Sequence, residues 1–265
     1  MGNILEVCDL KVHFPVRKGV LGFVDHYVKA VDGITFNLRR GETLGVVGES
    51  GCGKSTMSRA ILMLNKPCGG TIKLNGSNIL SLKGHDLLKY RRKVQVVFQD
   101  PLAALNPRLT VLEILTEAMV YHGLCKKEER REKAIELLES VGLPTDILER
   151  YPHEFSGGQR QRLCIARAIA LKPELLICDE AVSALDLTIR AQVLDLLAEL
   201  KKKLSLSIIF ITHDIGVVQH ISDRIIVMNN GKIVEEGVTT EVLSSPKEEY
   251  TKFLISSVPK IGKPL

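Results

Sequence analysis

Hydrophobic and polar residues alternate along the first part of the chain. The alternation runs through residues 4–14 and 28–38, which is the period of half-buried strands, and a Pro- and Gly-containing stretch, 15–22, separates the two runs. A short apolar segment, 43–47, then leads into a Gly-rich turn and a helix that we expect to begin near Lys54. The pattern predicts an antiparallel β-rich opening, followed by the strand, loop and helix that a phosphate-binding loop requires.

Helical periods replace the strand pattern between residues 101 and 171. Ala134, Leu137, Leu138 and Val141, for example, recur at helical spacing. Strands are predicted again, with helices between them, at 175–178, 207–212 and 224–228. The fold class is therefore α/β. We expect one domain, in which a helical subdomain, 101–171, is inserted into a core with a β subdomain, 1–100 and 172–265.

Composition is that of an ordinary globular protein, with 45% hydrophobic and 25% charged residues in 265. No apolar run approaches the roughly 18 residues of a membrane span, and Glu6 and Asp9 interrupt any secretion signal, so a cytosolic protein is expected. The net charge of +5 is scattered and Trp is absent, which argues against nucleic acid as a partner. The six cysteines show no metal or disulfide spacing, and several are expected to be buried apolar groups.

One segment matches the phosphate-loop pattern GxxxxGK[ST] in full. It consists of Gly48, Glu49, Ser50, Gly51, Cys52, Gly53, Lys54 and Ser55. The glycines let backbone N–H groups face a β-phosphate, Lys54 reaches the β- and γ-phosphates, and the Ser55 hydroxyl can ligate Mg²⁺. A chance Gly-rich turn is the alternative, and the strand before and the helix after the loop argue against it.

Two further motifs stand in the second half of the chain. The apolar run 175–178 delivers Asp179, which would hold Mg²⁺ directly or through water, and Glu180, which would accept a proton from an attacking water. Ser156-Gly157-Gly158-Gln159 precedes a helix expected at 160–170 and would present backbone donors to an anion. Taken alone, the first motif could be a solvated strand end and the second a turn with a Ser N-cap.

The motifs together resemble those of ABC ATPases, because Asp179 lies 23 residues beyond Ser156. The resemblance covers nearly the whole chain. It includes Gln99, similar to the family's Q-loop glutamine, Ser183-Ala184-Leu185-Asp186, similar to its D-loop, and His213, similar to its switch histidine.

The resemblance implies a P-loop NTPase core of the ABC-cassette type, with an N-terminal antiparallel β subdomain and an inserted helical subdomain. It implies ATP and Mg²⁺ as cofactors, with Glu180, His213 and Gln99 in catalysis. Mg²⁺ would be held by Ser55, Gln99 and Asp179. Besides the phosphate loop, nucleotide would contact Thr56, Ser156, Gly157, Gly158, Gln159 and Asp186.

Several of these residues have structural alternatives. Gln99 could be a surface glutamine at a strand end, His213 a helix-capping or core histidine, and Asp186 a helix N-cap. Adenine needs an aromatic or apolar platform, for which Phe14 is our choice and Tyr27 the alternative, because the insertion 15–26 makes the alignment ambiguous. A buried core Phe is nearly as good an interpretation of Phe14.

The branch of the family also follows from resemblance. Cassettes of oligopeptide, dipeptide and nickel permeases share the patterns at 94–101, 104–108, 151–155 and 178–183, and the match is closer to their second, F-type cassette. Phe155 replaces the leucine usual across the superfamily, as it often does in this branch. Many members continue into a Cys-containing tail, whereas this chain stops soon after 250–259, so an iron–sulfur site is not expected.

These resemblances imply an ATP-binding and ATP-hydrolysing subunit that energises a bacterial ABC importer, for oligopeptides or dipeptides in the first place. Implied partners are two membrane-spanning permease subunits, a second cassette in a heterodimer or homodimer, and indirectly a substrate-binding protein. The location would be peripheral, at the cytoplasmic face of the inner membrane. Alternatives are an importer of nickel or another small solute, a soluble ABC ATPase without a transport role, an exporter, and a P-loop kinase or GTPase.

Overall fold

The computed structural model describes residues 2–18 and 23–257. The chain divides into two compact units: unit 1 comprises Met1–Leu82 and Ile209–Leu265, and unit 2 comprises Lys83–Ile208. The expected helical segment, 101–171, lies wholly within unit 2. Its boundaries as a subdomain of one domain stay a prediction.

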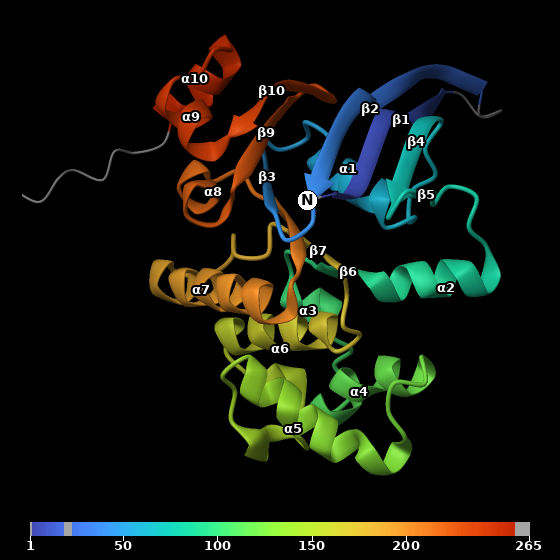
Figure 1. Ribbon diagram of the computed structural model, residues 1–265, viewed down its shortest axis with the longest axis vertical. Helices are drawn as coiled ribbons and strands as arrows, with labels where there is room; N and C mark the ends of the chain where they lie inside the picture. The colour runs from blue at the N-terminus through green and yellow to red at the C-terminus, as the bar shows by residue number, and fades with distance from the viewer. Residues whose placement is uncertain (1, 19–22, 258–265) are drawn as a thin grey trace, which may run out of the picture. The chain divides into compact units, whose positions relative to one another are not determined.

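Unit 1 contains a four-stranded antiparallel sheet in the order β2-β1-β4-β5 (Figure 1). Its strands are β1 (Asn3–Lys18), β2 (Phe23–Arg39), β4 (Gly69–Leu74) and β5 (Ser77–Asn78). Leu10 and Val12 of β1, two positions apart as alternation requires, are buried.

The first two strands were predicted as elements, but both are longer than the pattern indicated. β1 continues through Pro15, which lies opposite Tyr27. A proline has no N–H to donate, and it is tolerated here because β4 pairs with β1 only as far as Lys11 in the described residues. Of the predicted connection 15–22, positions 19–22 lie outside the described residues.

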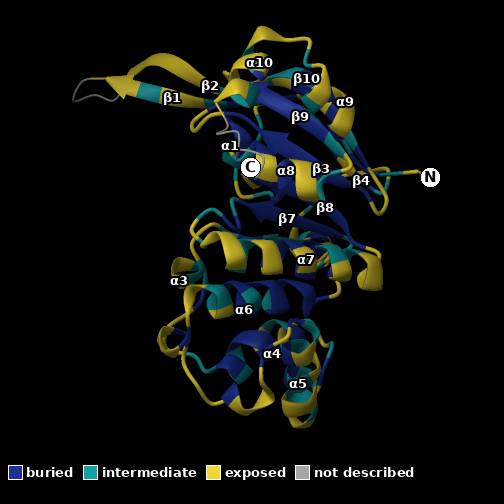
Figure 2. Cartoon of the chain, turned by 90° about the vertical axis from the view of Figure 1, so that its left-hand side faces the viewer, coloured by how far each residue is buried: buried dark blue, intermediate teal, exposed yellow. Residues whose placement is uncertain are grey.

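A second group of strands in unit 1 follows the order β10-β9-β3-β8. The strands are β3 (Thr43–Val47), β8 (Ser207–Ile211, whose first two residues belong to unit 2), β9 (Arg224–Asn229) and β10 (Lys232–Val238). β3 pairs with β9 in parallel. Both β3 and β8 are buried along their whole length, which explains why their sequences are apolar runs without alternation (Figure 2).

Of the helices of unit 1, α1 (Lys54–Ile61) and α8 (Ile215–Ile221) lie between strands in the chain, and α9 (Thr239–Ser244) and α10 (Glu249–Ser256) follow β10. α1 follows β3 directly after the Gly-rich loop, so the predicted strand, loop and helix are confirmed.

Unit 2 is mainly helical. Its helices are α2 (Gly84–Lys93), α3 (Pro101–Ala104), α4 (Val111–Tyr121), α5 (Arg130–Ser140), α6 (Gly157–Ile169) and α7 (Leu187–Leu204), with short 3₁₀ turns at Lys127–Glu129, Thr145–Ile147 and Pro152–Glu154. Two strands, β6 (Val94–Val97) and β7 (Leu175–Asp179), pair in parallel. None of the helices between residues 2 and 257 that the structure describes has the length and apolarity needed to cross a membrane.

A buried ion pair ties three strands of unit 1 together. Arg224 of β9 donates from Nη1 to both carboxylate oxygens of Glu42, at 2.9 and 3.2 Å, and from Nη2 to Glu236 of β10. Glu42, directly before β3, is only 7% exposed and also accepts from the Arg39 N–H at 2.7 Å. Such a pair is costly to break from one side, because the remaining charge stays buried.

We therefore predict that Glu42→Gln lowers the free energy of unfolding by about 2–3 kcal/mol, because the amide keeps the shape but not the charge that neutralises Arg224. Urea unfolding measures the change. The control is Glu249→Gln, which removes the exposed partner of Lys252 and should leave the unfolding midpoint in place. Equal effects of the two substitutions would contradict the assignment.

Candidate functional site

The loop between β3 and α1 has no space for side chains at two of its glycines. Gly48 has φ 151° and Gly53 has φ 109°. A Cβ at Gly48 would lie 2.2 Å from the carbonyl oxygen of Met228, and one at Gly53 would lie 2.2 Å from that of Ala30. Glycine is therefore required at both positions, and the loop backbone is packed against β9 and β2.

Lys54 lies at the first position of α1 and is 3% exposed. Its Nζ donates to the carbonyl oxygens of Gly48, at 2.6 Å, and Glu49, at 2.9 Å. These two carbonyl oxygens carry no formal charge, so neither offsets the positive charge that Lys54 brings to the start of the helix. An incoming phosphate would be attracted by this ammonium and by the helix N-terminus, so the loop fits the polyphosphate of a nucleotide.

The other loop residues fall into two groups. Glu49, Ser50 and Gly51 are exposed at the tip, whereas Cys52 is buried and Ser55 and Thr56 are half-buried at the helix start. A distant segment of the chain also holds the loop: the Gly231 N–H donates a hydrogen bond to the Cys52 carbonyl oxygen at 3.0 Å.

That contact was missed at the sequence level. Asn230 and Gly231 both have positive φ, in the tight turn between β9 and β10. The Asn-Gly pair predicts such a hairpin turn, but nothing local indicates which loop the turn touches.

His213 follows the end of β8. The Thr212 N–H donates to the carbonyl of Val46 at 3.1 Å, which brings the end of β8 beside the end of β3. His213 is exposed, and Asp214 caps α8 by accepting from the Gly216 and Val217 N–H groups. Exposure excludes the core alternative for His213, and the N-cap of α8 is Asp214.

Phe14 and Tyr27 lie on opposite faces of the β1–β2 ribbon. Phe14 pairs with Val28, and the next residue, Pro15, pairs with Tyr27, so alternation along the strands sets Phe14 and Tyr27 on opposite faces. Phe14 is 41% exposed and Tyr27 is 57% exposed. The interpretation of Phe14 as a buried core residue is therefore wrong: β1 extends beyond the packed part of the sheet at this point.

In unit 2, the parallel pairing of β6 and β7 sets Val97 opposite Cys178. Gln99 and the acidic pair Asp179-Glu180 consequently follow the same end of two neighbouring strands. Gln99 is exposed and Asp179 is buried at 7% exposure.

Glu180 has an unusual backbone for its residue type, with φ 51° in the left-handed region. Its carbonyl accepts from the Ser183 Oγ at 3.0 Å and the Ser183 N–H at 3.1 Å, which holds the turn that follows β7. Backbone strain of this kind concentrates at functional sites.

The segment Ser156–Gln159 forms the start of α6, which begins at Gly157 and not at the predicted residue 160. The reason is a capping box: the Gln159 N–H donates to Ser156 Oγ at 3.3 Å, and the Ser156 N–H donates to Gln159 Oε1 at 3.0 Å. Ser156, Gly157 and Gln159 are exposed, so this helix start is open to a ligand or partner.

Asp186 is the N-cap of α7, which the sequence indicated as an alternative role for this residue. Its carboxylate accepts a hydrogen bond from the Ile189 N–H at 3.0 Å. A Cβ at Gly158 would lie 2.5 Å from Cγ2 of Ile189. Gly158 is therefore needed for the close approach of the two helix starts, independently of any role at a ligand.

Four cysteines are buried, as expected: Cys52, Cys125, Cys164 and Cys178. Burial raises the pKa of the Cys164 thiol to about 11 and that of Cys178 to about 12, so both stay protonated at neutral pH. They are packing residues of unit 2. Cys8 and Cys68 are exposed.

Comparisons with known proteins agree with these motifs. The ABC transporter family matches residues 31–183. The dipeptide transport ATP-binding protein DppF of Escherichia coli is 47% identical over 98% of this chain and 77% of its own length. The oligopeptide transport ATP-binding protein AppF of Bacillus subtilis is 51% identical over 98% of this chain and 80% of its own length.

Solved structures lead to the same conclusion. The ATP-binding cassette MJ0796, in a dimeric post-hydrolysis state with ADP and Pi, superposes with a TM-score of 0.78 at 30% identity over 89% of this chain and 98% of that one. CbiO1 of Clostridium perfringens gives 0.78 at 28% identity over 92% of each chain. The predicted fold class is confirmed, and the chain belongs to the ABC transporter family of ATP-binding and ATP-hydrolysing cassettes.

Proposed function

We propose that this chain is the ATP-hydrolysing subunit of a bacterial importer of oligopeptides or dipeptides. The observation that carries the proposal is the 47–51% identity, over nearly the whole chain, to ATP-binding proteins of dipeptide and oligopeptide transport. An importer of nickel or another small solute stays the alternative, because a cassette does not itself bind the solute.

In the proposed site, the loop amides and Lys54 bind the β- and γ-phosphates of ATP. Ser55, Asp179 and Gln99 would hold Mg²⁺, and the bound ion would neutralise part of the negative charge of the phosphates. Glu180 takes the proton of the attacking water, and the exposed imidazole of His213 faces the γ-phosphate. Phe14 is proposed as the adenine platform in preference to Tyr27, since it is the less exposed of the two and lies two residues after the buried Val12.

A second cassette completes the site in this proposal. Ser156, Gly157, Gly158 and Gln159, at the open start of α6, would contact the γ-phosphate held by the partner's phosphate loop, with Asp186 beside them. ATP binding closes the two cassettes, and hydrolysis separates them. The partner is a different cassette in our proposal, with a homodimer as the alternative.

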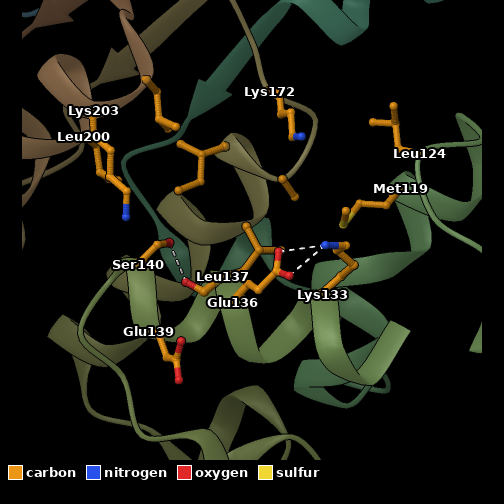
Figure 3. Close-up of a pocket in the computed structure, with 13 residues that line it drawn as sticks. Met119, Leu124, Lys133, Glu136, Leu137, Glu139, Ser140, Lys172, Leu200 and Lys203 are labelled. Carbon is orange, nitrogen blue, oxygen red and sulfur yellow. Dashed lines mark hydrogen bonds and ion pairs between the residues drawn. The ribbon is translucent and has the colours of Figure 1, made fainter. Parts of the chain in front are cut away.

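The permease subunits are proposed to dock on unit 2. A cavity of about 500 Å³ opens between the ends of α4, α6 and α7 and one face of α5. Its apolar floor includes Leu137 and Leu200, which Figure 3 labels, and Ile169 is a further apolar lining residue. Lys172, Lys203 and the ion pair Lys133–Glu136 lie around it. An apolar floor with a mixed-charge rim suits an amphipathic cytoplasmic helix of a membrane protein. The cassette would then be peripheral, at the cytoplasmic face of the inner membrane, with a substrate-binding protein on the other side.

For the chemistry, Glu180→Gln should retain ATP binding and lose at least about 100-fold in hydrolysis rate, because the amide keeps the shape but cannot take the proton. Phosphate release and binding of a fluorescent ATP analogue measure the two properties. Lys54→Ala is the matched comparison and should lose binding itself. Hydrolysis by Glu180→Gln within a few fold of the unaltered chain would remove Glu180 as the base.

The proposed contact between the start of α6 and the nucleotide of the partner cassette is tested by Gly157→Asp. A Cβ at Gly157 meets only Leu185 Cδ2, at 3.9 Å, so the carboxylate can be introduced without the clash with Ile189 that Gly158→Asp would cause. The variant should bind ATP normally as an isolated chain yet silence hydrolysis at the partner's site, measured in a mixture with the partner cassette. Loss of ATP binding by the isolated variant would show that the segment Ser156–Gln159 contacts the nucleotide of its own chain.

For transport, cells that produce this chain with its permease, partner cassette and binding protein should accumulate a labelled tripeptide, and Leu137→Gln should reduce uptake about tenfold by placing an amide on the docking floor. ATP hydrolysis by the purified variant should stay within twofold of the unaltered chain. The control is Ile135→Gln, a half-buried residue of the same helix that does not line the cavity. Accumulation of nickel in place of the peptide would favour the alternative solute.

A further inference from the structure

The C-terminal helix α10 contacts the phosphate loop through a residue that belongs to none of the motifs. The Glu49 N–H donates to the hydroxyl oxygen of Tyr250 at 3.1 Å, across 201 positions of the chain. Both residues lie in unit 1. Nothing in the local sequence of α10 indicates this contact.

The bonded N–H is part of the peptide group that joins Gly48 to Glu49. The carbonyl of the same peptide group accepts from Lys54 Nζ at 2.6 Å. The peptide is therefore held at both ends, by Tyr250 on its N–H and by Lys54 on its oxygen. Hydrogen bonds in such a series strengthen one another, and together they set the orientation of the group that holds the ammonium.

Tyr250 is itself firmly placed. Its side chain packs against a buried cluster that includes Val47, the residue directly before Gly48, and Val227 of β9. Burial raises the pKa of the Tyr250 hydroxyl, so it stays a neutral phenol at physiological pH.

The start of α10 is anchored to β10 by Glu235, which is 9% exposed. Its carboxylate accepts from the Lys247 N–H at 2.9 Å and the Glu248 N–H at 3.2 Å. Burial alone would raise the pKa of Glu235. The Lys247 N–H, the Thr251 side chain, the Glu248 N–H and the charge of Lys247 together outweigh burial and leave this pKa below its usual value. The carboxylate therefore remains charged, and it holds the segment that leads into Tyr250.

We propose that Tyr250 is a positioning residue of the phosphate loop, through which α10 sets the affinity of this cassette for nucleotide. The inference rests on the proposed nucleotide site at the loop. Without the hydroxyl, the Gly48–Glu49 peptide loses one of its two restraints, and the loop must be ordered when phosphate binds. The free-energy cost of ordering the loop then makes nucleotide binding weaker.

The test is Tyr250→Phe, which keeps the ring packing and removes the acceptor. ATP and ADP should each bind about threefold to tenfold more weakly, the loss expected for one hydrogen bond. The kcat at saturating ATP should stay within twofold, because the loop holds ground state and transition state alike, so KM alone rises. Tyr121→Phe, which makes the same change at an exposed residue of unit 2, is the control and should alter neither constant.

Hydrogen exchange of the Glu49 amide, measured without nucleotide, separates this inference from the proposed function. Exchange should be faster in Tyr250→Phe by about tenfold while the thermal midpoint is unchanged. Unaltered exchange, or affinities for ATP and ADP within twofold of the unaltered chain, would overturn the positioning role. Faster exchange in a chain that binds no nucleotide in either form would instead contradict the proposed site.

Discussion

The tight packing of the phosphate-loop backbone is the constraint on which unit 1 depends. The loop passes so close to β2 and β9 that a single Cβ at Gly48 or Gly53 would collide with a neighbouring carbonyl. That closeness gives Lys54 its buried position, because the ammonium is enclosed by the carbonyls of its own loop. In the proposed site, this cation would face the phosphates of the bound nucleotide.

The same constraint explains why distant segments matter to the loop. The turn at Gly231 donates to Cys52, the end of β8 donates to Val46, and α10 accepts from Glu49. Each contact satisfies a backbone group that would otherwise need water or a ligand. The loop is therefore preorganised by the strands and helices around it, and preorganisation reduces the cost of binding.

Unit 2 shows how one residue can serve structure and a proposed site together. Ser156 and Asp186 cap helices, and Gly158 permits the approach of α6 and α7. Capping fixes the first turn of α6 but leaves its start exposed, which is what a contact with a partner's nucleotide needs. The structural and functional interpretations of these residues are therefore compatible, although their role at nucleotide stays a prediction.

Local pattern determined much of this protein by itself. The apolar run before Gly48 and the glycines at 48 and 53 predict a phosphate loop. Their spacing is set by the backbone of a single loop between a strand and a helix, so neighbouring residues are enough to indicate it. Uninterrupted apolar runs predicted the buried strands at 43–47 and 175–178, and helical periodicity predicted the helices between residues 101 and 171. Only the tertiary structure decided that Phe14 is exposed, that α6 begins at Gly157, and that Gly231 and Tyr250 touch the loop. The physical reason is the distance along the sequence over which each effect acts. Secondary-structure propensity and hydrophobic periodicity depend on a few neighbouring residues, whereas these features depend on segments that meet only after the chain has folded.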